Sequence, residues 1–239
     1  MSTHRFTAAV GAAEVVGVLH LPAERPAPCV VACHGMGASK DSDKYLLLGR
    51  ELPAAGLALA RFDFRGSGES GGRYHDATIE TRVADLEAVL DHLAKHPELD
   101  GRFGLLGSSL GGFVALWAAS RAGAALPVVT WNAPAALREL PAADGDEAGE
   151  ALVAEVRRGG WDEAPTGVAG VLVIQGEADR VVPPAHGRAL FARAREPRRL
   201  HAIADADHRL TEMSHRREAL EESRRWLSAR LREIPARAS

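Results

Sequence analysis

Residues 107–111 read Gly-Ser-Ser-Leu-Gly and are the segment of this chain with the clearest chemical meaning. An apolar run precedes them, and residues 110–119 carry apolar side chains at helical spacing, which predicts a strand-to-helix turn. A G-x-S-x-G pattern there holds the serine hydroxyl clear of the backbone, because the glycines let strand and helix approach closely. Ser109 has this glycine spacing and Ser108 does not, so Ser109 is the candidate nucleophile. The alternative is a glycine-rich turn with a capping serine.

A serine hydroxyl is a weak nucleophile unless a base takes its proton and an acid orients the base. When the serine occupies such a turn, the partners follow in the order acid, then histidine. Asp179 comes after the strand-like run 170–176, and His208 comes after the strand-like run 200–203. A doubly wound sheet gathers catalytic groups at the ends of its strands. We therefore predict that Asp179 is the acid and His208 the base.

Other residues compete for these two roles. The chain has ten histidines, and the remaining ones fall within predicted strands, on helices or in loops. For the acid, Glu177 stands two residues earlier, whereas Asp205 and Asp207 either orient His208 locally or form the turn before it. Chain order and position after a strand favour Asp179 and His208 over these alternatives.

An oxyanion formed during acyl transfer needs backbone N–H donors fixed in advance. One donor is expected from the residue after the nucleophile, Leu110, and the second from a loop after an early strand. The buried-strand run 28–33 ends in His-Gly-Met-Gly, which makes Met36 the expected second donor and His34 a structural loop residue. A second glycine-rich run, residues 63–70, lacks the features of a phosphate-binding loop and is predicted to be a tight loop beside the site.

With these residues in place, the chain resembles the α/β-hydrolases over nearly its whole length. Residues 34–37, 63–70 and 175–183 are similar to runs in the serine esterases grouped with cinnamoyl (feruloyl) esterases and serine aminopeptidase-like hydrolases. The resemblance implies an α/β fold, with a mostly parallel central sheet and helices on both faces, and ester hydrolysis without a cofactor. Many relatives carry histidine before the nucleophile, where this chain has Ser108.

Length, charge and cysteine content agree with this expectation. A chain of 239 residues suits one α/β domain, and a net charge of −3 gives no electrostatic reason to bind nucleic acid or an anionic membrane. No apolar stretch is long enough to span a bilayer. Cys29 and Cys33 share a predicted strand, about 13 Å apart, too far for a disulfide. No cluster has metal-ligand spacing. We expect a cytoplasmic protein without metal or cofactor, and nothing in the sequence indicates its oligomeric state.

Alternating strand-like and helix-like segments define the expected organisation. Strands are predicted near residues 15–21, 28–33, 57–63, 102–107, 127–132, 170–175 and 199–204, with a long helix over 78–95. Residues 136–167 interrupt the pattern and hold eight acidic side chains against three arginines. We predict a small lid there, with a helix over 147–158; the alternative is a solvated surface insertion. Its acidic balance is expected to disfavour anionic esters.

The expected substrates are small-molecule esters, neutral and with short acyl chains or aryl groups. Trp131 and Asn132 end a predicted strand on the same edge as the three catalytic candidates, and Trp161 lies in the predicted lid. We therefore consider Trp131 and Trp161 candidates for substrate contact, although a tryptophan is more often part of the core. A further candidate is Gly35, in the loop after the strand-like run 28–33. Thioesters and small amides or peptides are alternative substrates for the same residues. A ligand-binding protein of this fold with slow hydrolysis is a further alternative.

Overall fold

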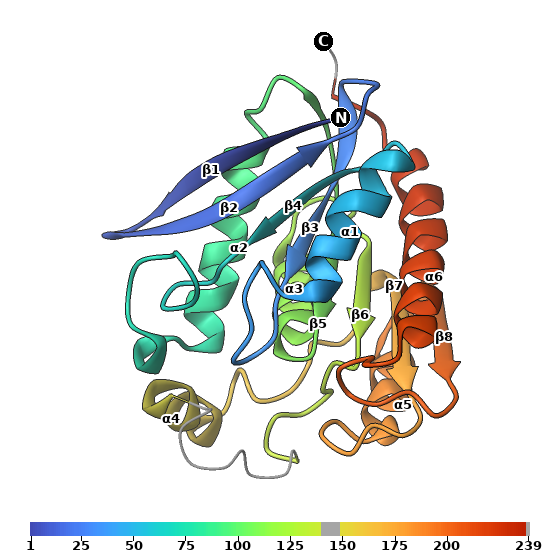
Figure 1. The fold of residues 1–239 in the computed structure, drawn as a ribbon. Helices are drawn as coiled ribbons and strands as arrows, with labels where there is room; N and C mark the ends of the chain where they lie inside the picture. Colours follow the sequence, from blue (N-terminus) through green and yellow to red (C-terminus); the bar gives the residue numbers. More distant parts are fainter. Residues whose placement is uncertain (140–148, 238–239) are drawn as a thin grey trace.

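One twisted sheet organises the protein, and helices cover both of its faces (Figure 1). The computed structural model describes residues 1–139 and 149–237. Within these residues eight strands pair in the order β1-β2-β4-β3-β5-β6-β7-β8. The first three neighbours, β1, β2 and β4, are antiparallel, and the pairs from β4 through β8 are parallel. The strands are β1 (Ser2–Val10), β2 (Ala13–Leu21), β3 (Ala27–Cys33), β4 (Ala58–Phe62), β5 (Leu99–Ser108), β6 (Val128–Trp131), β7 (Ala169–Gly176) and β8 (Arg195–Ile203).

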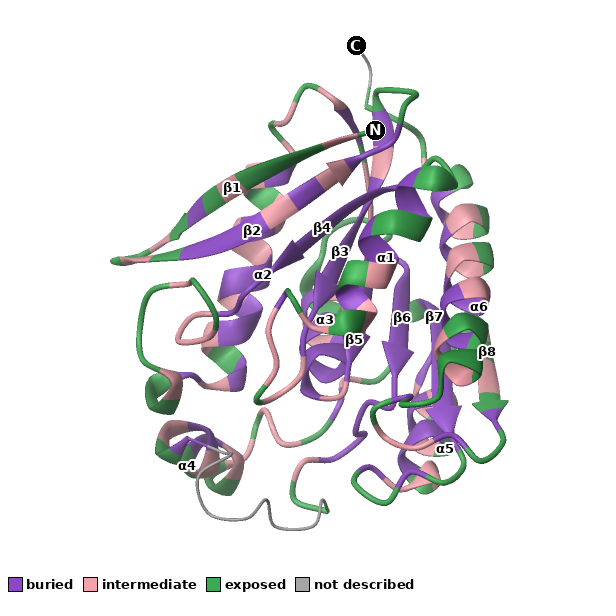
Figure 2. Cartoon of the chain, in the orientation of Figure 1, coloured by how far each residue is buried: buried purple, intermediate pink, exposed green. Residues whose placement is uncertain are grey.

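Two apolar layers fill the spaces between the sheet and the helices. The helices are α1 (Asp43–Ala54), the short 3₁₀ helix η1 (Tyr74–Asp76), α2 (Ile79–Leu93), α3 (Leu110–Arg121), α4 (Glu150–Arg158), α5 (Pro184–Arg193) and α6 (Met213–Arg232). Buried residues of α2, α3 and α5 pack on one face of the sheet, and those of α1 and α6 pack on the other. The central strands are buried over most of their length (Figure 2). This arrangement confirms the predicted mostly parallel sheet with helices on both faces.

The first strand is the element that the sequence did not reveal. β1 lies at the edge of the sheet, pairs only with β2, and has one buried residue, Ala8. Apolar residues alternate in β1 only at Phe6, Ala8 and Val10, and residues 2–5 are all polar, so the alternation by which strands are found in sequences is short here. The strands expected at the other seven places are present. β8 begins earlier than expected, at the charged residue Arg195, because it forms the opposite edge.

The insertion between β6 and β7 is docked against the start of α2. Helix α4 spans Glu150–Arg158, and the part of the expected helix at residues 147–148 lies outside the described residues. The buried Glu155 carboxylate accepts hydrogen bonds from the backbone N–H groups of Ile79, at 2.5 Å, and Glu80, at 3.1 Å. These are unpaired donors of the first turn of α2, where a negative charge is favourable. Glu155 therefore ties α4 to the fold.

Candidate active site

Ser109 occupies a sharp turn between β5 and α3. Its backbone has φ 54° and ψ −127°, a conformation that costs energy for any residue with a side chain. A Cβ atom at Gly107 would lie 2.3 Å from the Gly111 oxygen, and one at Gly111 would lie 2.2 Å from the Cys33 oxygen. The two glycines of the motif are therefore required by close packing of backbone on backbone. The Ser109 N–H donates to the Trp131 oxygen at 2.8 Å, which joins the turn to β6.

Ser109, His208 and Asp179 form a continuous chain of hydrogen bonds. The Ser109 Oγ lies 3.1 Å from His208 Nε2, and His208 Nδ1 lies 2.8 Å from Asp179 Oδ2. The other carboxylate oxygen of Asp179 accepts from the N–H groups of Val181, at 2.9 Å, and Val182, at 2.8 Å. With Asp179 as acceptor, Nδ1 carries the proton and Nε2 is free to accept the serine proton. The geometry is that of a nucleophile, a base and an orienting acid.

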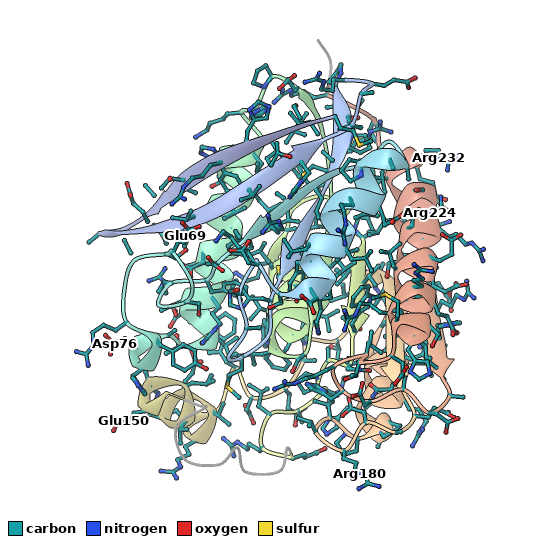
Figure 3. The ribbon with its side chains drawn as sticks, in the orientation of Figure 1. Glu69, Asp76, Glu150, Arg180, Arg224 and Arg232 are labelled. Carbon is teal, nitrogen blue, oxygen red and sulfur yellow. The ribbon has the colours of Figure 1, made fainter. Side chains whose placement is uncertain are left out.

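The carboxyl edge of the sheet brings these three residues together from distant parts of the chain. Ser109 follows β5, Asp179 follows β7, and His208 follows β8. Asp179 is 4% exposed. Its neighbour Arg180 points outward at the lower edge of the molecule in Figure 3, so the loop turns one side chain inward and the next into solvent.

The competing acids are engaged elsewhere. The Asp207 carboxylate accepts from the Thr211 backbone N–H at 2.8 Å and from the Thr211 hydroxyl at 2.6 Å. Glu177 is exposed, and Asp205 is exposed on a left-handed turn with φ 56°. Among these acids and Asp179, only Asp179 is hydrogen-bonded to His208 in the described part of the chain.

Asn132 is a site residue for which no role was predicted from the sequence. Its side-chain oxygen accepts from the Gly176 N–H at 2.7 Å, and its Nδ2 donates to the carbonyl oxygens of Asp207, at 3.1 Å, and His208, at 2.9 Å. It is 1% exposed and has φ 52°, a conformation that asparagine tolerates better than most residues. Asn132 thus joins the ends of β6 and β7 to the loop that carries His208.

The loop after β3 runs beside the nucleophile. A Cβ atom at Gly35 would lie 3.2 Å from the Ser109 Cβ and 3.8 Å from its Oγ, so only glycine leaves this space open. The backbone N–H groups of Met36 and Leu110 make no hydrogen bond within the described residues. Leu110 directly follows Ser109, and Met36 follows Gly35 in the loop that runs beside Ser109. Neither N–H has a partner within the described residues, and their role as oxyanion donors stays a prediction.

Buried polar groups fix this loop in place. His34 Nε2 accepts from the Phe64 N–H at 3.0 Å, and its Nδ1 pairs with the Gly35 oxygen at 2.8 Å. Burial lowers the pKa of His34 to about 4, so the ring is neutral and acts as a structural link. Asp63 is fully buried and accepts from the Lys40 N–H at 2.7 Å and its ammonium at 2.9 Å, and also from the Glu69 N–H at 3.0 Å. Residues 63–70 therefore form the tight loop that the sequence predicted.

Of the two tryptophans expected to contact substrate, Trp131 is corrected because it is buried in the core, whereas the role of Trp161 stays a prediction. The Trp131 indole is fully buried between the sheet and α6 and donates to the Ser223 hydroxyl at 2.9 Å, so no face is left for a ligand. Trp161 packs on Trp117, with ring centroids 4.7 Å apart, and beneath Arg121. Trp117 is eight residues along α3 from Ser109, roughly 12 Å of helical rise.

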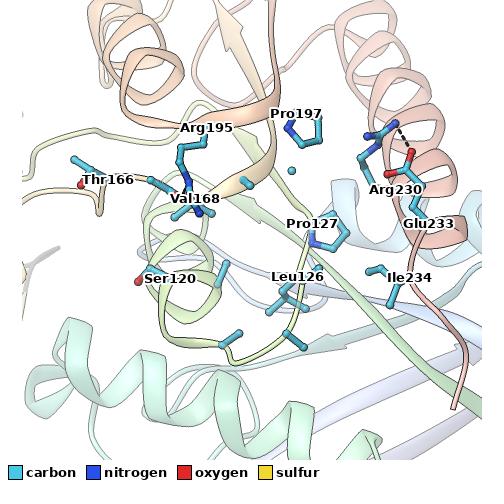
Figure 4. A pocket seen from close by; sticks show the side chains of 17 residues that line it. Ser120, Leu126, Pro127, Thr166, Val168, Arg195, Pro197, Arg230, Glu233 and Ile234 are labelled. Atoms are coloured by element: carbon cyan, nitrogen blue, oxygen red, sulfur yellow. Dashed lines mark hydrogen bonds and ion pairs between the residues drawn. The ribbon is translucent and has the colours of Figure 1, made fainter.

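A hollow of about 400 Å³ lies at the opposite edge of the sheet (Figure 4). Residues preceding β6 and β7 line it, together with the start of β8 and the end of α6, where Arg230 and Glu233 form an ion pair at 2.8 Å. It is therefore separate from the three catalytic candidates. Among the described residues no group of three or more histidines, cysteines or acids is placed to hold a metal ion. No helix in the described ranges has both the length and the apolar character needed to cross a membrane.

The sequence of this chain is similar to those of known hydrolases. A family model described as serine aminopeptidase, S33, matches residues 24–156, more than half of the chain. The bovine (Bos taurus) mitochondrial palmitoyl-protein thioesterase ABHD10 is 30% identical over 92 residues, which are 38% of this chain. The match spans only 28% of the length of that thioesterase.

Solved structures share the fold across nearly the whole chain. The structure of a protein from Agrobacterium vitis S4 superposes with a TM-score of 0.75 at 25% identity, covering 95% of this chain and 98% of the other. Est1E from Butyrivibrio proteoclasticus, solved with ferulic acid bound, superposes with a TM-score of 0.77 at 18% identity, again covering 95% and 98%. The sheet and its layers are thus those of known α/β-hydrolases.

Proposed function

Because this chain belongs to the serine aminopeptidase S33 family and is an α/β serine hydrolase, we propose that it hydrolyses carboxylic esters through Ser109, His208 and Asp179. The observation that carries the proposal is the chain of hydrogen bonds from the Ser109 hydroxyl through His208 to the Asp179 carboxylate. It supports a nucleophile, a general base and an orienting acid in the arrangement that acyl transfer requires.

In the proposed reaction the Ser109 oxygen attacks the acyl carbon while His208 Nε2 takes the hydroxyl proton. Asp179 holds the imidazole in the required tautomer and stabilises the imidazolium that forms. The N–H groups of Met36 and Leu110 stabilise the oxyanion. His208 then gives its proton to the leaving alkoxide, and an acyl-enzyme remains. Water, deprotonated by His208, attacks this acyl-enzyme, and His208 returns the proton to the Ser109 oxygen as the acid leaves.

We propose short acyl chains or aryl groups as the substrate class. Ser109 is partly exposed and the His208 side chain is 18% exposed, so the reacting atoms lie near the molecular surface. A site of this depth suits small esters and gives little apolar area to a long acyl chain.

The expected bias against anionic esters is not retained in this proposal. It rested on the acidic side chains of residues 136–167, and two of these are neutralised within the fold. Asp162 pairs with Arg138 at 3.0 Å, and Glu163 pairs with Arg193 at 2.9 Å. Charges paired in this way project little field onto a site elsewhere.

The test is hydrolysis of 4-nitrophenyl esters from two to sixteen carbons, and of methyl ferulate, by the native chain and by Ser109→Ala. We expect the highest rates at short acyl chains and a fall on the order of 10⁴-fold or more in kcat for the variant. Ser108→Ala is the matched control. A fluorophosphonate adduct on Ser108, or a maximum at twelve carbons or beyond, would contradict the proposal.

Thioesters are a second candidate class, favoured by the match to the bovine palmitoyl-protein thioesterase. The same three residues would serve, because a thiolate leaves more readily than an alkoxide and needs less help from His208. Paired acetyl and butyryl thioesters and oxygen esters distinguish the two classes. A kcat/KM consistently higher for thioesters, after correction for their intrinsic reactivity, would favour the thioesterase function.

A further inference from the structure

Three cationic side chains near the nucleophile form no ion pair with any described residue. They are Lys44 in the first turn of α1, Arg209 next to His208, and Arg216 in the first turn of α6. We call this group the basic cluster. Helices α1 and α6 cover the same face of the sheet, and both begin at its carboxyl edge (Figure 1). The cluster therefore lies on the edge that carries Ser109 and His208.

Lys44 reaches directly toward the nucleophile turn. Its ammonium donates to the Ser108 hydroxyl at 2.9 Å, and Ser108 is the residue before Ser109. The Ser108 side chain is 3% exposed, whereas Lys44 is partly exposed. An ammonium has three donors, and one hydroxyl satisfies one of them. In the described part of the chain no carboxylate lies within ion-pair distance of the Lys44 ammonium.

The two arginines lack ion pairs as well. Arg216 donates from Nε to the Leu210 carbonyl at 3.2 Å, in the loop that holds His208, and no carboxylate of the described residues pairs with it or with Arg209. Arg65, which follows β4 at this edge, does have an acidic partner in Asp85, at 2.5 Å. The basic cluster thus keeps its charge available to a ligand.

The pKa of Lys44 reflects the positive charges around its ammonium. Burial and the nearby charges of Arg216 and Arg209 lower the pKa of Lys44 to about 8, while Asp207 opposes the shift. Hydrogen bonds from the neutral Thr211 favour the ionised form of Asp207, so this carboxylate sets one negative charge against the three positive charges of the cluster. A bound anion would relieve the mutual repulsion of the three cations.

We propose that the basic cluster is a subsite for a carboxylate carried by the ester substrate. This inference rests on the proposed ester hydrolysis and narrows its substrate class to half-esters and esters of acidic alcohols or phenols. Arginine and lysine donors together bind a carboxylate with charge-assisted hydrogen bonds. Because the cluster borders both Ser108 and the His208 loop, the carboxylate would be held while the ester carbonyl lies at Ser109.

Matched substrate pairs test the subsite. On the acyl side, mono-4-nitrophenyl glutarate is compared with 4-nitrophenyl pentanoate, which has the same chain length. On the alcohol side, 4-acetoxybenzoate is compared with its methyl ester. We expect kcat/KM about tenfold higher for the carboxylate member of one pair, as a charged hydrogen bond would give. Added salt should reduce this ratio. Equal or lower kcat/KM for both carboxylate members would overturn the inference.

Substitutions test which residues cause the preference for carboxylate substrates. Lys44→Met and Arg216→Gln should each lower the carboxylate preference severalfold and leave kcat/KM for the neutral ester nearly unchanged. Arg217→Gln is the control, since it removes the same charge from an exposed neighbour with no ion pair in the described structure. Ser108→Ala removes the hydrogen bond to Lys44 but keeps the ammonium, so the preference should persist. A preference that survives loss of both Lys44 and Arg216 would reject the basic cluster as its source.

Binding provides a readout that does not depend on turnover. Calorimetric titration of Ser109→Ala with monomethyl glutarate should give a Kd about tenfold below that for methyl pentanoate, and Lys44→Met should abolish the difference. If the carboxylate ligand binds better while the native chain hydrolyses no ester, the proposed function fails and the subsite stands. Equal binding of both ligands would overturn the subsite, whatever the activity.

Discussion

The side-chain amide of Asn132 donates a hydrogen bond to the carbonyl oxygen of His208 at 2.9 Å, which joins the end of β6 to the loop that carries the proposed base. The same side chain accepts the Gly176 N–H from the end of β7. One buried amide therefore sets the positions of two neighbouring strand ends and of the His208 backbone.

Replacing Asn132 should impair catalysis, although Asn132 is not one of the three catalytic candidates. Asn132→Ala leaves the Gly176 N–H without its acceptor and should lower the free energy of unfolding by about 1–3 kcal/mol. Asn132→Asp keeps that acceptor and loses the two donors to the His208 loop. We expect it to lower kcat about 10–100-fold, as loss of precise positioning does. Urea unfolding and ester kinetics measure the two effects; unchanged kcat in a folded Asn132→Asp protein would contradict this role.

Asp179→Asn should lower kcat by around 10⁴-fold, because the amide stabilises the wrong imidazole tautomer. The protein should stay folded, since the asparagine oxygen can still accept from the Val181 and Val182 N–H groups. Asp207→Asn is the matched control and should have a mild effect, because Asp207 bonds to Thr211. If Asp207→Asn were the more damaging change, the acid would be misassigned.

Stability should fall as the solution is acidified from neutral pH, in part because of His34. Its pKa is about 4 in the folded chain, below the ordinary 6.5, so the unfolded state binds a proton first. Stability from this group is complete above about pH 6.5 and declines as pH falls toward 4. The loss should reach about 2 kcal/mol at pH 5. Urea unfolding of the native chain and of His34→Gln at pH 7 and pH 5 tests this, and equal pH dependence in both would refute it.

Glu155→Gln should loosen the attachment of α4 to the rest of the fold. The carboxylate accepts two backbone N–H groups at the start of α2, and an amide accepts them without the negative charge that favours this position. We expect a loss of about 1 kcal/mol in the free energy of unfolding. Limited proteolysis near residues 150–158 should also become faster. Glu150→Gln, on the exposed side of α4, should change neither measurement.

Much of the fold and the three catalytic candidates were predictable from local patterns. Glycine spacing marked the turn at Ser109, and buried-strand runs ending before Asp179 and His208 placed both residues at the carboxyl edge. Each signal lies within about ten residues of sequence, where backbone geometry and strand burial act directly. The parallel sheet then brings the three side chains together, since the carboxyl ends of its strands share one edge.

Tertiary structure alone decided how side chains far apart in the sequence meet. Trp131 ends its strand near the site, but the pleat turns its ring toward α6, and sequence does not say which layer each face of a buried strand meets. Lys44 and Ser108 are 64 residues apart and Glu155 and Ile79 are 76 apart. Such contacts depend on how α1 and α4 pack, and no periodicity encodes that packing. Local sequence patterns are enough to assign residues to the carboxyl edge, whereas the packing of α1 and α6 sets which charges beside them lack an ion pair among the described residues.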